Sequence, residues 1–294
     1  MCSHTCLPVS PGSRKSTTSP GGNGARWSGK PTNVSYRYQS RCPSLSLMIR
    51  PLMGYLPYLV FHVLFESIQR SNTRLKRLVV FENFNQQYTS DLQRFIPAEH
   101  IARNPHPAVG RMVALASLRL EHLAASFLVD ARHFFAIEPF WKWPNLTSLV
   151  LTSKVLRLGE DPVQIGAMLR AAAAAAMRMP RLETMEIWNG RKGLAAVFRY
   201  QTLRNARQAT VTWRATWELA MEPLLIRAWK AVLHHRYDDS WSLGVVQERL
   251  DAAAIKSHGD AIPCLRLLLD QVIRPVSLQQ IQMEQKALEG ANTV

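Results

Sequence analysis

Three neighbouring residues carry the side-chain types of a hydrolase triad, namely Ser257, His258 and Asp260. A nucleophile, its base and the residue that orients the base usually come from separate segments, because neighbours in sequence rarely converge on one reacting atom. Gly259 and Asp260 instead fit a helix terminator followed by the N-cap of the next helix. We therefore interpret this cluster as structural.

The sequence lacks the short motifs of common catalytic and nucleotide-binding sites. It contains no G-x-S-x-G, no H-E-x-x-H, no P-loop and no G-x-G-x-x-G. Cys2, His4 and Cys6 are metal-ligand types, but a zinc site of this kind needs a second pair of ligands. The sequence thus predicts no metal and no cofactor. An enzyme of unrecognised class is the alternative to a binding protein.

The elements that would position any site repeat one apolar spacing, L-x-x-L-x-L. Strands are predicted near residues 75–81, 115–121, 146–152, 182–188 and, with a weaker copy, 208–214. In leucine-rich repeats this spacing marks a short strand whose apolar side chains point into the core. Most copies here lie further apart than the roughly 20 to 29 residues of such repeats. We expect an α/β fold that is an irregular leucine-rich-repeat-like solenoid, with short parallel strands alternating with helices. An ordinary α/β domain is the alternative.

One helix between two of these strands has clear boundary signals. Asp161 fits the N-cap, Pro162 fits the first helical position, and Pro180 ends the helix. This predicts a helix over about 162–178. Helical spacing also predicts helices over 57–69, 88–101 and 124–135. From residue 223 the C-terminal part is expected to be helical, over 223–235, 243–256, 261–273 and from 277 onwards.

The positive charge is concentrated near the N-terminus. The 294-residue chain has a net charge of +15, from 36 basic and 21 acidic residues, and its first 65 residues contain seven of the basic and none of the acidic ones. We expect residues 1–44 to be a disordered basic extension, residues 45–288 to form a single domain, and residues 289–294 to be a tail. Nucleic-acid binding through the basic N-terminal extension is a second alternative function. The moderately basic body makes nucleic acid the less favoured partner.

The cysteines and the apolar segments indicate the compartment. The body carries a single cysteine, Cys264, whereas a secreted domain of this size would more often have paired cysteines. We expect an intracellular protein of the cytoplasm or nucleus. Mitochondrial targeting is less favoured, because the Pro- and Gly-rich N-terminus is a poor amphipathic helix. Arg50, Pro51 and further breakers interrupt the apolar stretch 45–65, so no membrane span is expected.

Five separated segments resemble an uncharacterised family of filamentous-fungal proteins. They are MPRLETMEIWNG (179–190), VFRY (197–200), WRATW (213–217), SHGDAI (257–262) and VIRPVSLQQI (272–281). Members of that family are often described as F-box or leucine-rich-repeat-like proteins with a domain of unknown function. The resemblance implies that an F-box would recruit a ubiquitin-ligase adaptor while the repeat region holds a substrate. LPYLVFHVLFESI (56–68) looks like part of an F-box, whereas residues 1–55 do not.

These features favour a non-enzymatic protein–protein recognition module, whose most specific form is the substrate-binding part of an F-box-type ubiquitin-ligase subunit. A solenoid presents the outer face of its strands to a partner. We expect contacts at the outward strand positions, which are Arg77, Phe81, Arg119, Glu121, Thr152, Glu186, Trp188, Thr212 and Arg214. This prediction depends on the strand register, because a one-residue slip would bury the set.

Overall fold

The structure is a computed structural model that describes residues 44–49, 57–71, 74–83, 105–136, 138, 140–268 and 272–291. The chain divides into two compact units, Met1–Tyr38 and Gln39–Val294, and all described residues belong to the second. The predicted N-terminal extension up to residue 43, the Cys2–His4–Cys6 cluster and the predicted helix 88–101 lie outside the described residues. At the other end, helix continues to residue 291, past the predicted domain end at 288.

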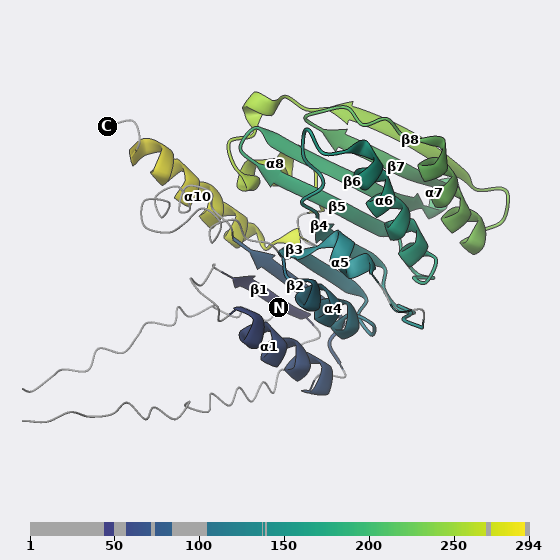
Figure 1. Cartoon of the computed structure of the whole chain (residues 1–294), viewed down its shortest axis with the longest axis horizontal. Helices are drawn as coiled ribbons and strands as arrows, with labels where there is room; N and C mark the ends of the chain where they lie inside the picture. Colours follow the sequence, from purple (N-terminus) through teal and green to yellow (C-terminus); the bar gives the residue numbers. More distant parts are fainter. Residues whose placement is uncertain are drawn as a thin grey trace, which may run out of the picture. The chain divides into compact units, whose positions relative to one another are not determined.

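One open sheet of eight strands organises the described part of the chain, and its strands lie side by side in sequence order (Figure 1). The strands β1 to β5 pair in parallel, β6 and β7 pair antiparallel to their predecessors, and β8 returns parallel to β7. Their bounds are β1 (Ser44–Ile49), β2 (Arg77–Glu82), β3 (His122–Asp130), β4 (Ser148–Thr152), β5 (Thr184–Arg191), β6 (Leu194–Leu203), β7 (Gln208–Ala215) and β8 (Ser242–Arg249).

Helices cover both faces of this sheet, and each face has its own apolar core. The first face packs against α1 (Pro57–Ser71), α4 (Pro107–Ala116), α5 (Ala131–Phe135), α6 (Pro162–Ala176) and α7 (Pro223–Arg236). The second face packs against α8 (His258–Cys264) and α10 (Pro275–Ala291). Two short 3-10 helices, η1 (Arg204–Ala206) and η2 (Ala252–Ala254), complete the described elements. No helix among the described residues is long and apolar enough to cross a membrane.

The best-punctuated predicted helix and the apolar strand spacing are confirmed. A side-chain oxygen of Asp161 accepts a hydrogen bond from the backbone N–H of Val163 at 2.9 Å, so Asp161 is the N-cap of α6. In four of the predicted strands, apolar residues at this spacing enter the core of the first face. They include Leu78 and Val80 of β2, Leu149 and Leu151 of β4, Met185 and Ile187 of β5, and Ala209 and Val211 of β7.

Three predicted elements are wrong. Residues 115–121 form no strand, because α4 ends there and Leu115 is 40% exposed at its last turn. The strand lies later, at β3, where a helix over 124–135 was predicted. Residues 124 and 125 of that strand enter opposite cores, and a strand buried on both faces shows no period-two pattern. The predicted helix 243–256 is largely the edge strand β8. The bounds of a further predicted helix, 261–273, are also wrong, because α8 begins at His258 and ends at Cys264 and residues 265–268 are not helical.

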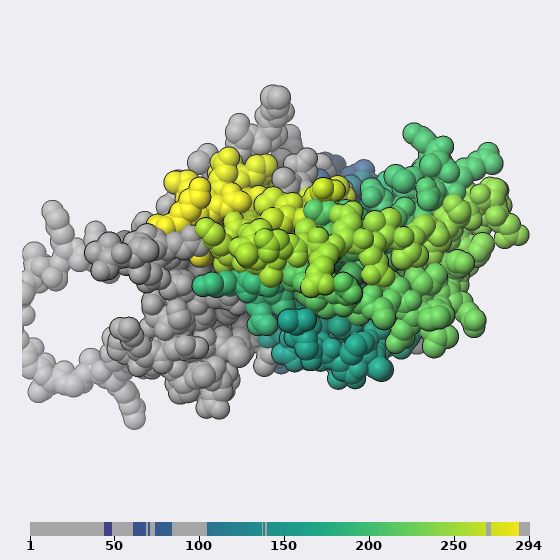
Figure 2. All heavy atoms as spheres, turned by 90° about the horizontal axis from the view of Figure 1, so that it is seen from above, coloured from purple at the N-terminus to yellow at the C-terminus, as the bar shows by residue number. Residues whose placement is uncertain are grey.

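The second face of the sheet is not open along its whole length. Side chains of β2 to β6 on this face, such as Phe81 and Trp188, pack against Ile262 of α8 and Ile281 of α10. Figure 2 shows the C-terminal residues, coloured yellow-green to yellow, at the surface of the molecule. The C-terminal segment thus occupies a sheet face that a solenoid would offer to a partner.

Candidate functional site

One residue from each strand forms a continuous line across the second face of the sheet. Direct strand partners are joined in the order Ser44, Arg77, His122, Ser148, Thr184, Gln201, Thr210 and Gly244. Side chains alternate between faces along a strand. Since Val79 and Phe81 enter the second core, Arg77 points to the same side. The line contains seven polar residues and one glycine, and we call it the polar row.

The polar row is partly open to solvent. Arg77, His122, Gln201 and Thr210 are partly exposed, whereas Ser148 and Thr184 are buried. Burial lowers the pKa of His122, and the positive charge of Arg77 adds to that effect. His122 is therefore neutral at pH 7. The row offers hydroxyl, amide, imidazole and guanidinium groups, which can donate hydrogen bonds to a partner and, except for the guanidinium, accept them.

Beside the polar row, towards the carboxyl ends of β2 to β5, a buried ion pair spans β5 and β6. The Arg199 Nε atom donates to Glu186 Oε1 at 2.6 Å, and the two side chains are 15% and 0% exposed. Burial raises the pKa of Glu186, and the neighbouring guanidinium of Arg199 opposes this rise. A buried pair of this kind is stable only if its remaining polar atoms also find partners.

Those further partners belong to the C-terminal segment. The guanidinium of Arg199 also donates to the carbonyl oxygen of Arg266 at 2.6 Å, and Arg214 Nε donates to that of Cys264 at 2.7 Å. The backbone N–H of Leu268 donates to Glu186 Oε2 at 3.5 Å. Two cations thus bind the carbonyl groups at the end of α8, where a helix leaves carbonyls without intrahelical partners. We call Glu186, Arg199 and Arg214 the clamp.

His258 does not assemble a catalytic triad. Its Nε2 atom lies 3.0 Å from Asn83 Oδ1, and its ring contacts Phe81 and Phe127. Burial lowers the pKa of His258 to about 4, so the ring is neutral at pH 7 and donates to the amide oxygen.

Ser257 and Asp260, the neighbours of His258, form the N-terminal cap of α8. This agrees with a structural role for the cluster, although the capping residue differs from the predicted one. Ser257, not Asp260, is the N-cap of α8, and its Oγ atom bonds both the N–H and the carboxylate of Asp260. Gly259 lies inside the first turn of the helix rather than ending one.

The predicted partner-binding residues divide into a buried and an accessible group. Phe81, Thr152, Glu186 and Trp188 are at most 4% exposed, so in this structure their side chains contact other parts of the same chain. Of the remaining five, Arg119 is exposed, Arg214 belongs to the clamp, and Arg77, Glu121 and Thr212 are partly exposed. The sequence analysis missed Arg199, His122 and Gln201, although strand alternation places all three on the same face.

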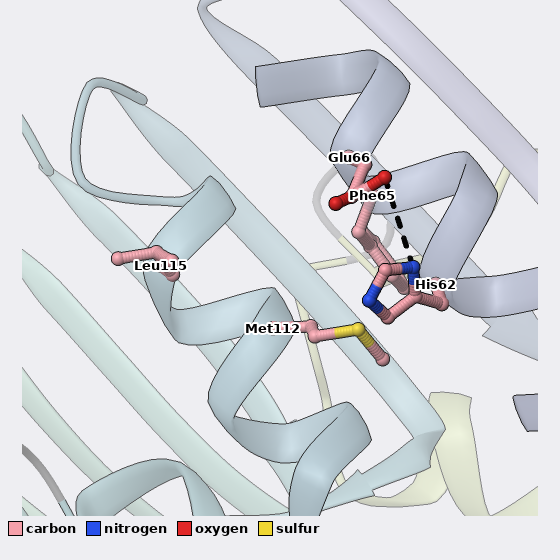
Figure 3. A pocket seen from close by; sticks show the side chains of 5 residues that line it. All are labelled: His62, Phe65, Glu66, Met112 and Leu115. Carbon is pink, nitrogen blue, oxygen red and sulfur yellow. Dashed lines mark ion pairs between the residues drawn. The ribbon is translucent and has the colours of Figure 1, made fainter. Parts of the chain in front are cut away.

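Two grooves lie beside α4 among the described residues. The larger one, of about 300 Å³, is lined by the apolar residues Ile68, Leu75, Leu115, Ala116, Leu118 and Leu120 and by one charged residue, Arg119. The smaller, shallow groove of about 150 Å³ lies between α1 and α4 (Figure 3), lined by His62, Phe65, Glu66, Met112 and Leu115. His62 Nδ1 lies 3.7 Å from Glu66 Oε2 at its rim. The volume of this smaller groove is below the roughly 300 Å³ at which small-molecule sites begin. Within the described ranges, no group of three His, Cys, Asp or Glu residues could hold a metal ion.

Comparison with known proteins gives a family without an assigned role. Residues 70–274 match a family described as a family of unknown function, DUF6546. No curated protein and no solved structure matches the chain. The family description names neither an F-box nor a leucine-rich repeat nor a fungal origin, so those parts of the resemblance stay predictions. The match covers more than half of the chain and includes β2 to β8, and the protein belongs to this family of unknown function, DUF6546.

Proposed function

We propose that this protein is a non-enzymatic protein-recognition module that binds its partner at the polar row. The observation that carries the proposal is the register that pairs Arg77 with His122 on β2 and β3, and Gln201 with Thr210 on β6 and β7. All four residues are partly exposed, and the buried Ser148 and Thr184 lie between the two pairs. Rigid strands fix the spacing of these donors and acceptors before a partner arrives, which lowers the ordering cost of binding. Arginine commonly dominates such interfaces.

Two features support recognition over catalysis. The clamp uses the charged groups of Arg199 and Arg214 to hold backbone carbonyls of the protein's own chain. The same sheet face therefore already binds a protein segment in an intramolecular way. A catalytic site would need a base and a nucleophile within hydrogen-bond reach of one another, and the cluster at Ser257 does not supply this geometry.

We include in this proposal that β1 to β5 and their helices form an irregular leucine-rich-repeat-like solenoid. The parallel strands follow one another in sequence order, and consecutive helices α1, α4, α5, α6 and α7 pack pairwise on one face. In a solenoid each repeat contacts only its neighbours, so local stability varies along the array. Protection of backbone amides from hydrogen exchange that changes stepwise from β1 to β5 would support this arrangement. Uniform protection across the sheet would contradict it.

The F-box form of the proposal is the more specific one. The F-box-like fragment coincides with α1, which connects β1 to β2 and packs against α4. An adaptor would therefore have to bind a helix that is also part of the sheet domain. Co-purification of a cullin and its adaptor would support a ubiquitin-ligase subunit, and a reproducible partner without them would support a plain binding module.

The experiment compares tagged variants expressed in the protein's own cells. Quantitative mass spectrometry measures which proteins co-purify with the wild type and with the double variant Gln201→Ala/Thr210→Ala. Its matched control is Gln164→Ala/Ser67→Ala, which removes the same kinds of groups from exposed positions on α6 and α1. We expect the partner to be lost only from the row variant. Equal recovery with all three proteins would refute the proposed surface.

A further inference from the structure

The outer edge of β8 is the open end of the sheet. β8 pairs with β7 in unbroken parallel register over all eight of its residues, and β8 is the last strand of the sheet among the described residues. The Ser242 N–H donates to the Arg207 carbonyl at 3.2 Å, and the Leu250 N–H donates to the Ala215 carbonyl at 2.8 Å. The even-numbered residues of β8 therefore direct their backbone groups towards β7.

The odd-numbered residues consequently direct their backbone N–H and C=O groups away from the sheet, because these groups alternate sides along a strand. No backbone hydrogen bond to another described residue involves these groups. They belong to Leu243, Val245, Gln247 and Arg249. Such a row of free donors and acceptors is a template for one more strand.

Protective features that usually guard an edge strand are missing from β8. The strand contains no proline and no lysine, and its register with β7 shows no bulge. Its two charged residues already have partners, since Glu248 contacts Arg214 and Arg249 lies 2.8 Å from Glu218. The uncharged centre is open to solvent, with Val245 and Val246 exposed by 43% and 39%.

We propose that this edge binds an extended segment of a partner protein, which adds as a ninth strand and carries apolar residues between acidic flanks. Backbone hydrogen bonds to the four outward residues would provide much of the affinity, and alternate apolar side chains of the segment would pack beside the exposed valines. The inference rests on the proposed recognition function, but it uses a surface separate from the polar row.

The positive charge of α7, beside the β8 edge, favours an acidic partner segment. Helix α7 packs against β8 on the first face of the sheet. It carries the cationic residues Arg227 and Lys230 on its exposed side and no acidic residue within its bounds. Arg227 and Lys230 are exposed and have no carboxylate partner among the described residues. An acidic segment on β8 would lie near this cationic helix and gain from it.

A second copy of the chain is the less suitable occupant. Antiparallel pairing of two β8 edges requires a two-fold axis perpendicular to the sheet, and this axis keeps both α7 helices on the same face. The two cationic helices would then lie beside one another across the axis. Like charges at such close range oppose association, and the net charge of +15 adds to that effect.

The test uses a dye-labelled synthetic peptide, EEVTVTVEE, and fluorescence anisotropy with the full chain. Val245→Pro removes one outward N–H and leaves the bonds to β7 intact, so we expect it to weaken binding at least about tenfold. Val245→Thr keeps the N–H and a β-branched side chain and serves as the matched control, with unchanged affinity expected. Gln247→Pro replaces Val245→Pro if circular dichroism shows that the latter does not fold.

The charge requirement is tested separately. The peptide KKVTVTVKK should bind more weakly than EEVTVTVEE, and the double variant Arg227→Glu/Lys230→Glu should reverse that order. Absence of peptide binding, or equal affinity of the wild type and the proline variant, would overturn the proposal. A wild-type dimer in light scattering that Val245→Pro converts to a monomer would assign the edge to a second copy instead. Loss of the cellular partner from the polar-row variant would be unaffected by any of these outcomes.

Discussion

Removing Arg199, one of the two cations of the clamp, should reveal the free-energy cost of burying Glu186. In Arg199→Met the alkyl stem remains, but the carboxylate at 0% exposure loses its ion-pair partner at 2.6 Å. Breaking a buried pair from one side costs about 3–5 kcal/mol, because the remaining charge has no compensation. The carbonyls of Leu265 and Arg266 also lose their donor. We therefore expect a loss of about 4 kcal/mol in the free energy of unfolding at pH 8.

The loss should depend on pH in a defined direction. Burial raises the pKa of Glu186 above its ordinary value, and without Arg199 only the hydrogen bond from the Leu268 N–H opposes that rise. A carboxyl group with a raised folded-state pKa stabilises the fold when protonated, and this contribution is lost as the pH rises through the folded-state pKa. The destabilisation of Arg199→Met should therefore be smaller at pH 5 than at pH 8, by up to about 1.4 kcal/mol for each pH unit of the window.

Urea unfolding followed by tryptophan fluorescence measures both effects, and hydrogen exchange over residues 258–291 reports whether the C-terminal segment is released. The control is the double variant Glu186→Gln/Arg199→Met, which buries no charge. It should be more stable than Arg199→Met at pH 8 and should show little of its pH dependence. A loss below about 1 kcal/mol, the size of a surface pair, or an equal loss at both pH values, would refute the reasoning.

Three further predictions concern other buried contacts. Burial lowers the pKa of His258 from 6.5 to about 4 in the folded state, so the wild-type free energy of unfolding should fall by up to about 3 kcal/mol as the pH drops from 6.5 towards 4. In urea titrations His258→Gln should lack this component, and the same dependence of stability on pH in both proteins would contradict the prediction. Gly190→Ala would place a methyl group 2.4 Å from the Ala261 Cβ atom and should lower the free energy of unfolding by about 1–3 kcal/mol. Adding Ala261→Gly to this variant should restore part of the loss. Thermal unfolding that shows no such recovery would count against the contact. Arg236 donates to three carbonyl oxygens near the end of α6, so Arg236→Lys should lower the free energy of unfolding by about 2 kcal/mol. A melting temperature equal to that of the wild type would show that the several N–H donors of the guanidinium are not needed.

The apolar core of the first face was predictable because its signals are local. Asp161 and Pro162 mark the start of α6, and the spaced leucines of β4 enter one core. Both patterns depend only on residues a few positions apart, where capping and strand alternation act. The same reasoning failed at β3 and β8. A strand buried on both faces and an exposed edge strand each lack the half-buried alternation by which strands are recognised.

The sequence by itself determined β2, β4, β5 and β7 with their core-facing residues, the start of α6, and the side of the strands on which Arg77, Glu186 and Arg214 lie. Only the tertiary structure decided what covers that side. The C-terminal segment packs there through contacts such as Glu186 to Leu268, 82 positions apart, and Asn83 to His258, 175 positions apart. No local pattern encodes such pairings, because they depend on how separate strands and helices meet in space. For that reason the burial of Trp188, the clamp, the polar row and the open edge of β8 emerged only once the sheet was assembled.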